Sequence, residues 1–79
     1  MKINLKEKLY YNIGEVSKAF NVNSSLLRFW EKEFEELKPK KKSNGIRKYT
    51  NADIEILKKI FYLLKEKKLT IEGAKVSMN

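Results

Sequence analysis

The sequence contains no cysteine and no histidine. Their absence excludes disulfides, thiolate metal sites, cysteine or histidine nucleophiles and pH sensing by an imidazole. No apolar run approaches the ~20 residues that span a bilayer, and no signal-peptide hydrophobic region follows Met1. The sequence therefore predicts a cytoplasmic protein with no bound cofactor or metal and no place in a membrane.

Acidic residues are scarce relative to basic ones. Ten Asp and Glu face 18 Lys and Arg, so the formal net charge is +8, and only two of the basic residues are Arg. Such a charge on a small domain favours a polyanion partner, first nucleic acid and second an anionic membrane. The alternative is that the lysines serve solubility alone. Arg28 and Arg47 stand out because a guanidinium makes bidentate contacts that lysine cannot make.

A chain of 79 residues has room for one domain with a thin core. Its hydrophobic content of 42% argues against disorder. The sequence shows no phosphate-binding loop and no pocket of paired carboxylates in so small a core. We therefore expect a single domain over residues 1–79 that is not an enzyme.

Capping patterns and apolar stripes predict four helices. Asn12 with Glu15, and Thr50 with Asp53, have the spacing of capping boxes. Thr70 is a suitable cap for a short last helix. The expected helices cover about residues 12–20, 23–36, 51–67 and 70–78.

The segment between the second and third helices predicts a two-stranded hairpin. Asn44-Gly45 is a hairpin-turn signal, and Pro39 confines its strand to an edge. Such a basic run is usually a solvated loop, but after a helix that faces DNA it is typical of a wing over phosphates or in the minor groove. Its basic residues are Lys38, Lys40, Lys41, Lys42, Arg47 and Lys48.

The second helix has aromatic side chains on more than one side, in the stretch LLRFWEKEF at residues 26–34. At about 100° per residue, its residues separate into two faces. The face expected in the core holds Leu26, Leu27, Trp30 and Phe34. The opposite, outward face holds Ser25, Arg28, Phe29 and Lys32.

The outward face of the second helix suits a DNA major groove. Arg and Lys reach phosphates or guanine edges, Ser reaches either, and a ring packs on sugars or a thymine methyl. In the alternative interpretation, Phe29 packs under the hairpin and Arg28 pairs with Glu31 or Glu35. A third arrangement has Phe29 doing both, with one edge in the core and one on DNA.

The motifs IGEVSK, LLRFWE, GIRKYT followed by Asp53, and LTIEGAK after a long helix occur in this order. Together they resemble the N-terminal DNA-binding domain of the MerR family of bacterial transcription regulators, over about residues 10–76. The resemblance implies a mainly α fold, a winged helix-turn-helix. Such a fold has two helices, a two-stranded β wing and two further helices.

The resemblance also implies which residues contact DNA. They are Asn23, Ser24 and Ser25 at the start of the second helix, Arg28 and Phe29 on its outward face, Arg47 and Tyr49 of the wing, and Lys65 near the end of the third helix. Charge and position alone add Lys32, Lys41 and Lys42.

The chain departs from the family pattern at two places that matter. Phe29-Trp30 stands where members often have two Tyr, so a contact through a phenolic hydroxyl is lost. Lys68 stands where a Gly commonly ends the third helix, so we expect a left-handed backbone penalty there.

The first expected function is sequence-specific binding of double-stranded promoter or operator DNA by a bacterial regulator, with RNA polymerase as an indirect partner. Similar regulators continue into a dimerising helix and an effector-sensing domain, which are absent from this chain. A full-length protein would then be a homodimer, and this chain a monomer or weak dimer. Two alternatives are an excisionase-like architectural DNA-binding protein and a protein-interaction module that uses the apolar face of the last two helices.

Overall fold

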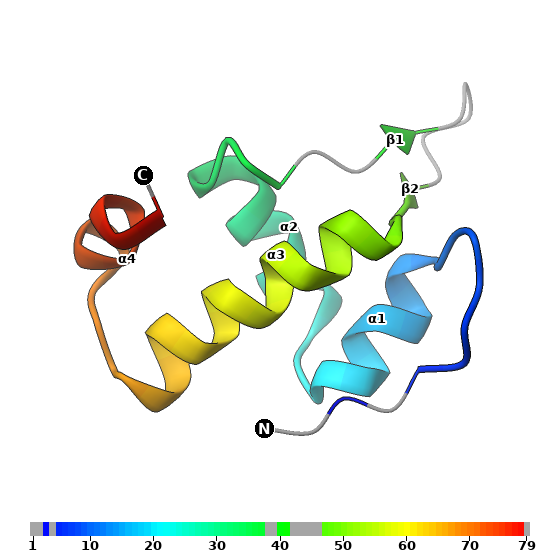
Figure 1. Cartoon of the computed structure of the whole chain (residues 1–79), viewed down its shortest axis with the longest axis horizontal. Coiled ribbons are helices and arrows are strands. Elements are labelled where there is room, and N and C mark those ends of the chain that lie inside the picture. The colour runs from blue at the N-terminus through cyan, green and yellow to red at the C-terminus, as the bar shows by residue number, and fades with distance from the viewer. Residues whose placement is uncertain (1–2, 4, 38–39, 42–46, 79) are drawn as a thin grey trace.

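The computed structural model describes residue 3 and residues 5–37, 40–41 and 47–78, with the main chain alone at residues 40, 41 and 47. This part of the chain is mainly helical (Figure 1). Its elements are α1 (Ile13–Phe20), α2 (Ser24–Glu33), β1 (Lys40–Lys41), β2 (Arg47–Lys48), α3 (Asn51–Phe61), a π-helical turn (Tyr62–Glu66) and α4 (Ile71–Met78). Within these described ranges, no helix is long and apolar enough to cross a membrane.

The two predicted capping boxes are confirmed. At α1, the Asn12 side chain accepts a hydrogen bond from the Glu15 N–H at 2.8 Å, and the Glu15 carboxylate accepts the Asn12 N–H at 3.1 Å. At α3, Thr50 and Asp53 make the same reciprocal pair. Each box satisfies two backbone donors that a helix start leaves without partners. The two helix starts are therefore determined by local sequence.

A sharp turn joins α1 to α2. Asn21 takes the left-handed conformation, with φ 56°, and its N–H donates to carbonyls of the last turn of α1. Asparagine tolerates this conformation better than most residues. The Val22 N–H then donates to the Ser17 carbonyl at 3.0 Å. Two helices joined by a tight turn are the expected helix-turn-helix arrangement.

The second helix is shorter than the sequence suggests. It ends at Glu33 and not near Glu36, because Phe34 leaves the helix with φ −112° and ψ 110°. This extended residue turns the chain so that both Phe34 and Leu37 reach the core, each 1% exposed. Burial of two more large apolar side chains outweighs the loss of one helical turn.

The core lies where α1, α2 and α3 meet, with α3 across the middle of the molecule (Figure 1). The Trp30 ring meets the Phe61 ring edge to face at a centroid distance of 6.5 Å, and Phe20 lies 5.9 Å from the same ring. These contacts hold α1 and α2 against α3. The buried apolar residues are Tyr11, Val16, Phe20, Leu27, Trp30, Phe34, Leu37, Tyr49, Ile54, Leu57, Ile60, Leu63 and Ala74.

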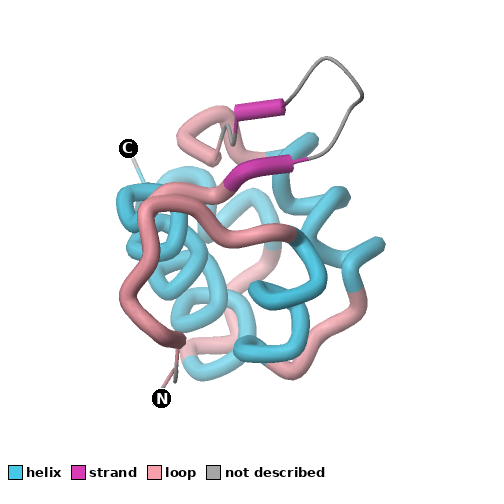
Figure 2. The backbone as a smooth tube through the Cα atoms, turned by 90° about the vertical axis from the view of Figure 1, so that its right-hand side faces the viewer, coloured by secondary structure: helices cyan, strands magenta, loops and turns pink. Residues whose placement is uncertain are grey.

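The N-terminal segment runs along the outside of the helices before it enters the fold (Figure 2). Its Ile3 and Leu5 pack against the core. The Tyr11 hydroxyl donates to the Lys6 carbonyl at 2.8 Å and accepts the Lys8 N–H at 3.0 Å. The Lys8 ammonium in turn binds the Glu15 carboxylate at 2.6 Å, and this hydrogen bond lowers the pKa of Glu15.

The two short strands pair antiparallel, with Lys40 opposite Lys48 and Lys41 opposite Arg47. Just beyond them, Tyr11 and Tyr49 exchange two backbone hydrogen bonds of 2.8 Å each. This bridge joins the base of the strand pair to the segment before α1. The predicted Asn44-Gly45 turn lies outside the described residues.

The end of the third helix differs from the prediction of one helix over residues 51–67. Regular α-helix stops at Phe61, and the next five residues form a π-helical turn. The residues most buried along this stretch follow a spacing of three, at Ile54, Leu57, Ile60 and Leu63, whereas Leu64 is half-buried. Only the last of these buried residues, Leu63, lies in the π-helical turn.

Lys68 ends this stretch in the left-handed conformation, with φ 56°, as expected from its position. The Leu69 N–H donates to the Leu63 carbonyl at 2.9 Å, which is one residue farther back than the six-to-one bond of a Schellman motif that follows a regular α-helix. A lysine side chain is strained in this conformation, whereas glycine is not.

We therefore predict that Lys68→Gly stabilises the protein by about 0.5–1 kcal/mol, because relief of the left-handed strain exceeds the added entropy of glycine in the unfolded chain. Urea unfolding measures the change. Lys67→Gly is the matched control, since Lys67 is an exposed neighbour with an ordinary φ of −83°. The control should lower the stability, and equal effects of both variants would contradict the strain at Lys68.

Candidate nucleic-acid interface

The outward face of α2 is exposed as the helical spacing predicts. Ser25, Arg28, Phe29 and Lys32 are all exposed, while Leu27 lies on the buried side. Phe29 is 45% exposed. The face therefore presents a hydroxyl, two cations and an aromatic ring together.

The alternative partners considered for Arg28 and Phe29 are not those that the structure presents. Among the residues that the structure describes, Arg28 makes no ion pair with Glu31 or Glu35. Phe29 is half in solvent, so it is not packed under the hairpin as a core side chain. Both side chains are available to a partner.

The start of α2 also leaves polar groups available. Asn23 is the N-cap by backbone geometry, but its side chain makes no capping hydrogen bond, and it is exposed. Ser24 begins the helix and is half-buried. The first N–H groups of a helix attract anions, because they lack partners within the helix and carry the positive end of its dipole.

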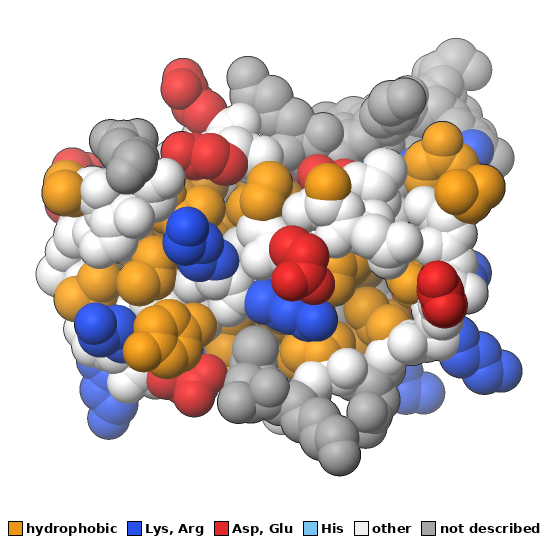
Figure 3. Space-filling view, in the orientation of Figure 1, with side chains coloured by type: hydrophobic (Ala, Val, Ile, Leu, Met, Phe, Trp, Pro, Cys, Tyr) orange, Lys and Arg blue, Asp and Glu red, His pale blue; other side chains and the backbone are white. Residues whose placement is uncertain are grey.

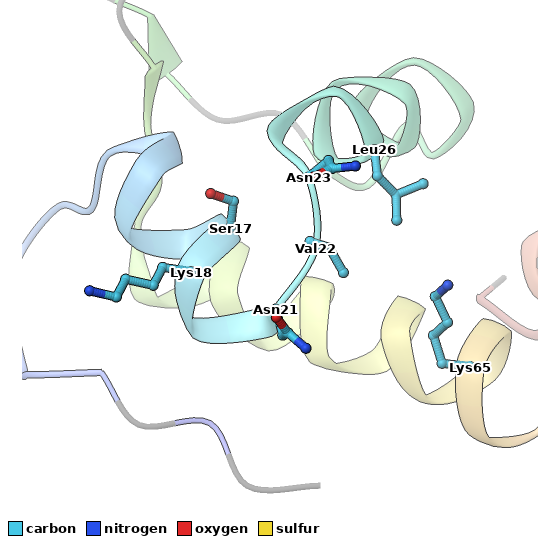
Figure 4. A pocket seen from close by; sticks show the side chains of 7 residues that line it. All are labelled: Ser17, Lys18, Asn21, Val22, Asn23, Leu26 and Lys65. Atoms are coloured by element: carbon cyan, nitrogen blue, oxygen red, sulfur yellow. The ribbon is translucent and has the colours of Figure 1, made fainter.

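A hollow of about 420 Å³ borders the turn between α1 and α2. Figure 4 shows the Lys65 side chain rising from the π-helical turn toward the start of α2, across from the α1 side chains. Polar and cationic groups predominate around this opening, so it suits an anion. Its lining residues are Ser17, Lys18, Asn21, Val22, Asn23, Leu26 and Lys65.

Sequence reasoning named Lys65 and Asn23 but missed Ser17, Lys18 and Asn21 in this hollow. The signal lay in the polar residues that follow the buried Val16 and Phe20 closely at the end of α1. A helical wheel puts them on the solvent side. The wheel does not show that the left-handed turn at Asn21 brings them beside α2.

Tyr49, at the base of the strand pair, was expected to contact DNA, but the structure places its side chain in the core. Tyr49 is fully buried, and its hydroxyl donates to the Glu31 carboxylate on α2. A contact of this side chain with DNA would require it to leave the core. Beside it, the Lys48 ammonium lies 4.9 Å from the centre of the Tyr10 ring.

The predicted hairpin residues are only partly described. Lys41 and Arg47 face each other in the strand register, which puts two cationic residues on adjacent strands. Lys42 lies outside the described residues. The strand pair is the next element after α2 in the chain.

The acidic end of α2 is engaged with α4. Glu33 binds Lys75 at 3.0 Å, and this hydrogen bond raises the pKa of Lys75. Glu35 and Glu36 are exposed beside them and line a second hollow with Lys32. The carboxylates thus gather at the opposite end of α2 from Asn23.

The face of the molecule seen in Figure 3 carries side chains of both charge signs. In the view of Figure 3, where α3 lies in front of α2, acidic and basic side chains alternate. Among the residues that the structure describes, no group of three or more acidic side chains is arranged to hold a metal ion.

A short turn between two helices, with an exposed basic and aromatic second helix, defines a helix-turn-helix protein. The family model of the MerR HTH family regulatory proteins matches residues 11–79, most of the chain, and the chain belongs to this family. It is similar to the HTH-type transcriptional repressor CarH of Myxococcus xanthus, with 33% identity over 67 residues. Those residues are 85% of this chain and 20% of CarH, so the chain spans about a fifth of that relative. No solved structure is significantly similar.

The family to which the chain belongs is one of helix-turn-helix regulatory proteins. The family match begins at Tyr11, the residue whose backbone pairs with Tyr49. It includes the whole of the exposed α2 face and the hollow beside it.

The two faces of α2 can be tested with one pair of substitutions. Phe29→Ala should cost less than about 1 kcal/mol of unfolding free energy, because the ring is half exposed. Phe34→Ala removes the same atoms from the core and should cost about 3–5 kcal/mol. Thermal or urea unfolding measures both, and similar costs for the two variants would mean that Phe29 belongs to the core.

Proposed function

We propose that this chain is the sequence-specific, double-stranded DNA-binding domain of a bacterial MerR-like transcription regulator, with α2 in the major groove and the strand pair as a wing. The exposed α2 face carries the proposal, because it places Arg28 and Phe29 in solvent beside Ser25 and Lys32. A buried or ion-paired face would offer DNA nothing.

Each α2 side chain has a role that follows from its chemistry. Arg28 is the residue for a base edge, since its planar fork matches the two acceptors of guanine. Phe29 packs on a sugar or a thymine methyl, and Lys32 meets a phosphate. Ser24 and Ser25, in the first turn of α2, reach phosphate oxygens together with the helix N-terminus.

The wing follows α2 and adds charge. Lys41, Lys42 and Arg47 are the wing residues proposed to meet the backbone or the minor groove. Tyr49 takes another role, because its ring is buried. We assign it to holding the base of the wing, not to contact with DNA.

The hollow beside α2 is proposed to seat a second stretch of phosphates. Lys65 supplies the charge from the π-helical turn, and Asn23 supplies a side chain free of capping bonds. Lys18 borders the same hollow. The duplex would then be held on both sides of the α2 axis, by the wing on one side and by this hollow on the other.

The whole protein is proposed to act as a homodimer that distorts a promoter between two half-sites, so that RNA polymerase uses it. Residues 1–79 would form the single domain that recognises one half-site. Alone, this chain would be a monomer or a weak dimer. The similarity to a repressor supports regulation of transcription. Whether transcription is activated or repressed would be a property of the whole protein.

The test is a fluorescence titration with random duplex DNA at several salt concentrations, repeated with single-stranded RNA. We expect duplex affinity to fall steeply with salt, with a slope of about 0.9 per phosphate contacted, and weaker binding to the RNA. A selection for the preferred site should then recover one sequence. No duplex binding at low salt would contradict the proposal and direct attention to the exposed Tyr62 and Val76 as a protein-binding surface.

Arg28 should carry sequence discrimination. Arg28→Ala should lower affinity for the selected site by about tenfold or more, because a bidentate base contact is worth about 1–3 kcal/mol. Arg28→Lys keeps the charge and loses the fork, so it should retain the salt slope while losing preference for the selected site. Titration of both variants with selected and random duplexes measures this preference. If Arg28→Lys keeps the preference for the selected site, Arg28 does not contact a base through its guanidinium.

Lys65 should act on phosphates without regard to sequence. Lys65→Ala should weaken binding to selected and random duplexes alike and reduce the salt slope by about one. Lys58→Ala is the matched control, because it removes the same charge from another part of the surface. Lys58 lines a different hollow, beside Ile3 and Leu5. If the two variants bind DNA equally, the charge of Lys65 matters only through the net charge of the protein.

A further inference from the structure

We infer that Tyr49 and Glu31 form a positioning pair that sets the angle between the wing and α2, and so decides whether both contact the same duplex. The inference rests on the proposed function, because it concerns the geometry of that DNA site. Neither side chain acts as a DNA contact in this role.

The pair joins two residues that are 18 positions apart in the chain. The Tyr49 ring is fully buried, and its hydroxyl donates to a carboxylate oxygen of Glu31. Glu31 stands one turn after Arg28 and immediately before Lys32 on α2. The bond therefore ends on α2 between two of the side chains proposed to bind DNA.

The main chain at Tyr49 is held from two other directions. Its N–H and carbonyl pair with Tyr11 at 2.8 Å each, and the next residue, Thr50, caps α3. These contacts set where the base of the wing lies relative to α1 and α3. The hydroxyl bond adds the third direction, toward α2.

A hydrogen bond to a carboxylate is stronger and more directional than one between neutral groups. The core immobilises the Tyr49 ring, so only the C–O bond of its hydroxyl group can rotate. Rotation of the wing about its base must break this bond or tilt α2. The carboxylate is also kept bonded, so it does not face phosphates as a bare charge.

The functional effect is that of joining two binding surfaces rigidly. When the wing and α2 keep a fixed relation, the second contact forms within the same complex at high effective concentration. When the relation loosens, each surface binds with little help from the other, and the wing contacts are lost first. Loss of the positioning pair should therefore lower both the affinity for duplex DNA and the number of phosphates contacted.

Tyr49→Phe removes only the hydroxyl and keeps the ring in the core. Tyr10→Phe is the matched control: it makes the same chemical change at a half-exposed residue beside the wing and keeps the ring that Lys48 contacts. Both variants and the wild type are titrated with duplex DNA at several salt concentrations, at a temperature where unfolding curves show all three fully folded.

We expect Tyr49→Phe to lower duplex affinity by about three- to tenfold and to reduce the salt slope by about one phosphate, while Tyr10→Phe behaves as the wild type. The double variant Tyr49→Phe/Glu31→Ala tests the pairing. Because the hydroxyl acts through Glu31, Tyr49→Phe should have no further effect on affinity once Glu31 is alanine.

Two results would overturn the positioning pair. One is a Tyr49→Phe variant with a lower melting temperature but unchanged affinity and salt slope, which would make the bond a stability contact only. The other is full additivity of Tyr49→Phe and Glu31→Ala in DNA affinity. By contrast, absence of salt-dependent duplex binding in the wild type and in Tyr10→Phe would refute the proposed function itself, and the positioning role with it.

Discussion

Burial of Trp30 against Phe61 is the contact on which the rest of the structure depends. It presses α2 onto α3, and with that face of α2 committed to the core, the opposite face has to carry Arg28 and Phe29 outward. A core this thin offers no second layer of helices to cover that face. The shape of the core therefore determines which side chains are available to a partner.

Much of the fold follows from short-range patterns. The capping boxes at Asn12 and Thr50 depend on residues three apart, and the strained end at Lys68 was visible as a missing glycine. The two faces of α2 follow from helical spacing. These features are local, so a single sequence contains the information that determines them.

The features that sequence reasoning missed depend on contacts between distant segments. Phe34 leaves the helix because the core accepts it, and helical propensity alone gives no sign of that. Tyr49 reads as a surface wing residue until the core and Glu31 are in place. The hollow at Lys65 requires the π-helical turn and the α1–α2 turn to meet, and no periodicity in either segment predicts their meeting.

The hydroxyl of Tyr11 makes the segment before it part of the folded unit. Its bonds to Lys6 and Lys8, and the packing of Leu5 on the core, anchor residues that precede the start of the family match. A domain cut at that boundary would keep every helix yet lose the residues that bond to Tyr11, whose backbone pairs with Tyr49. The folded domain of this protein thus begins before Tyr11, where the family match begins.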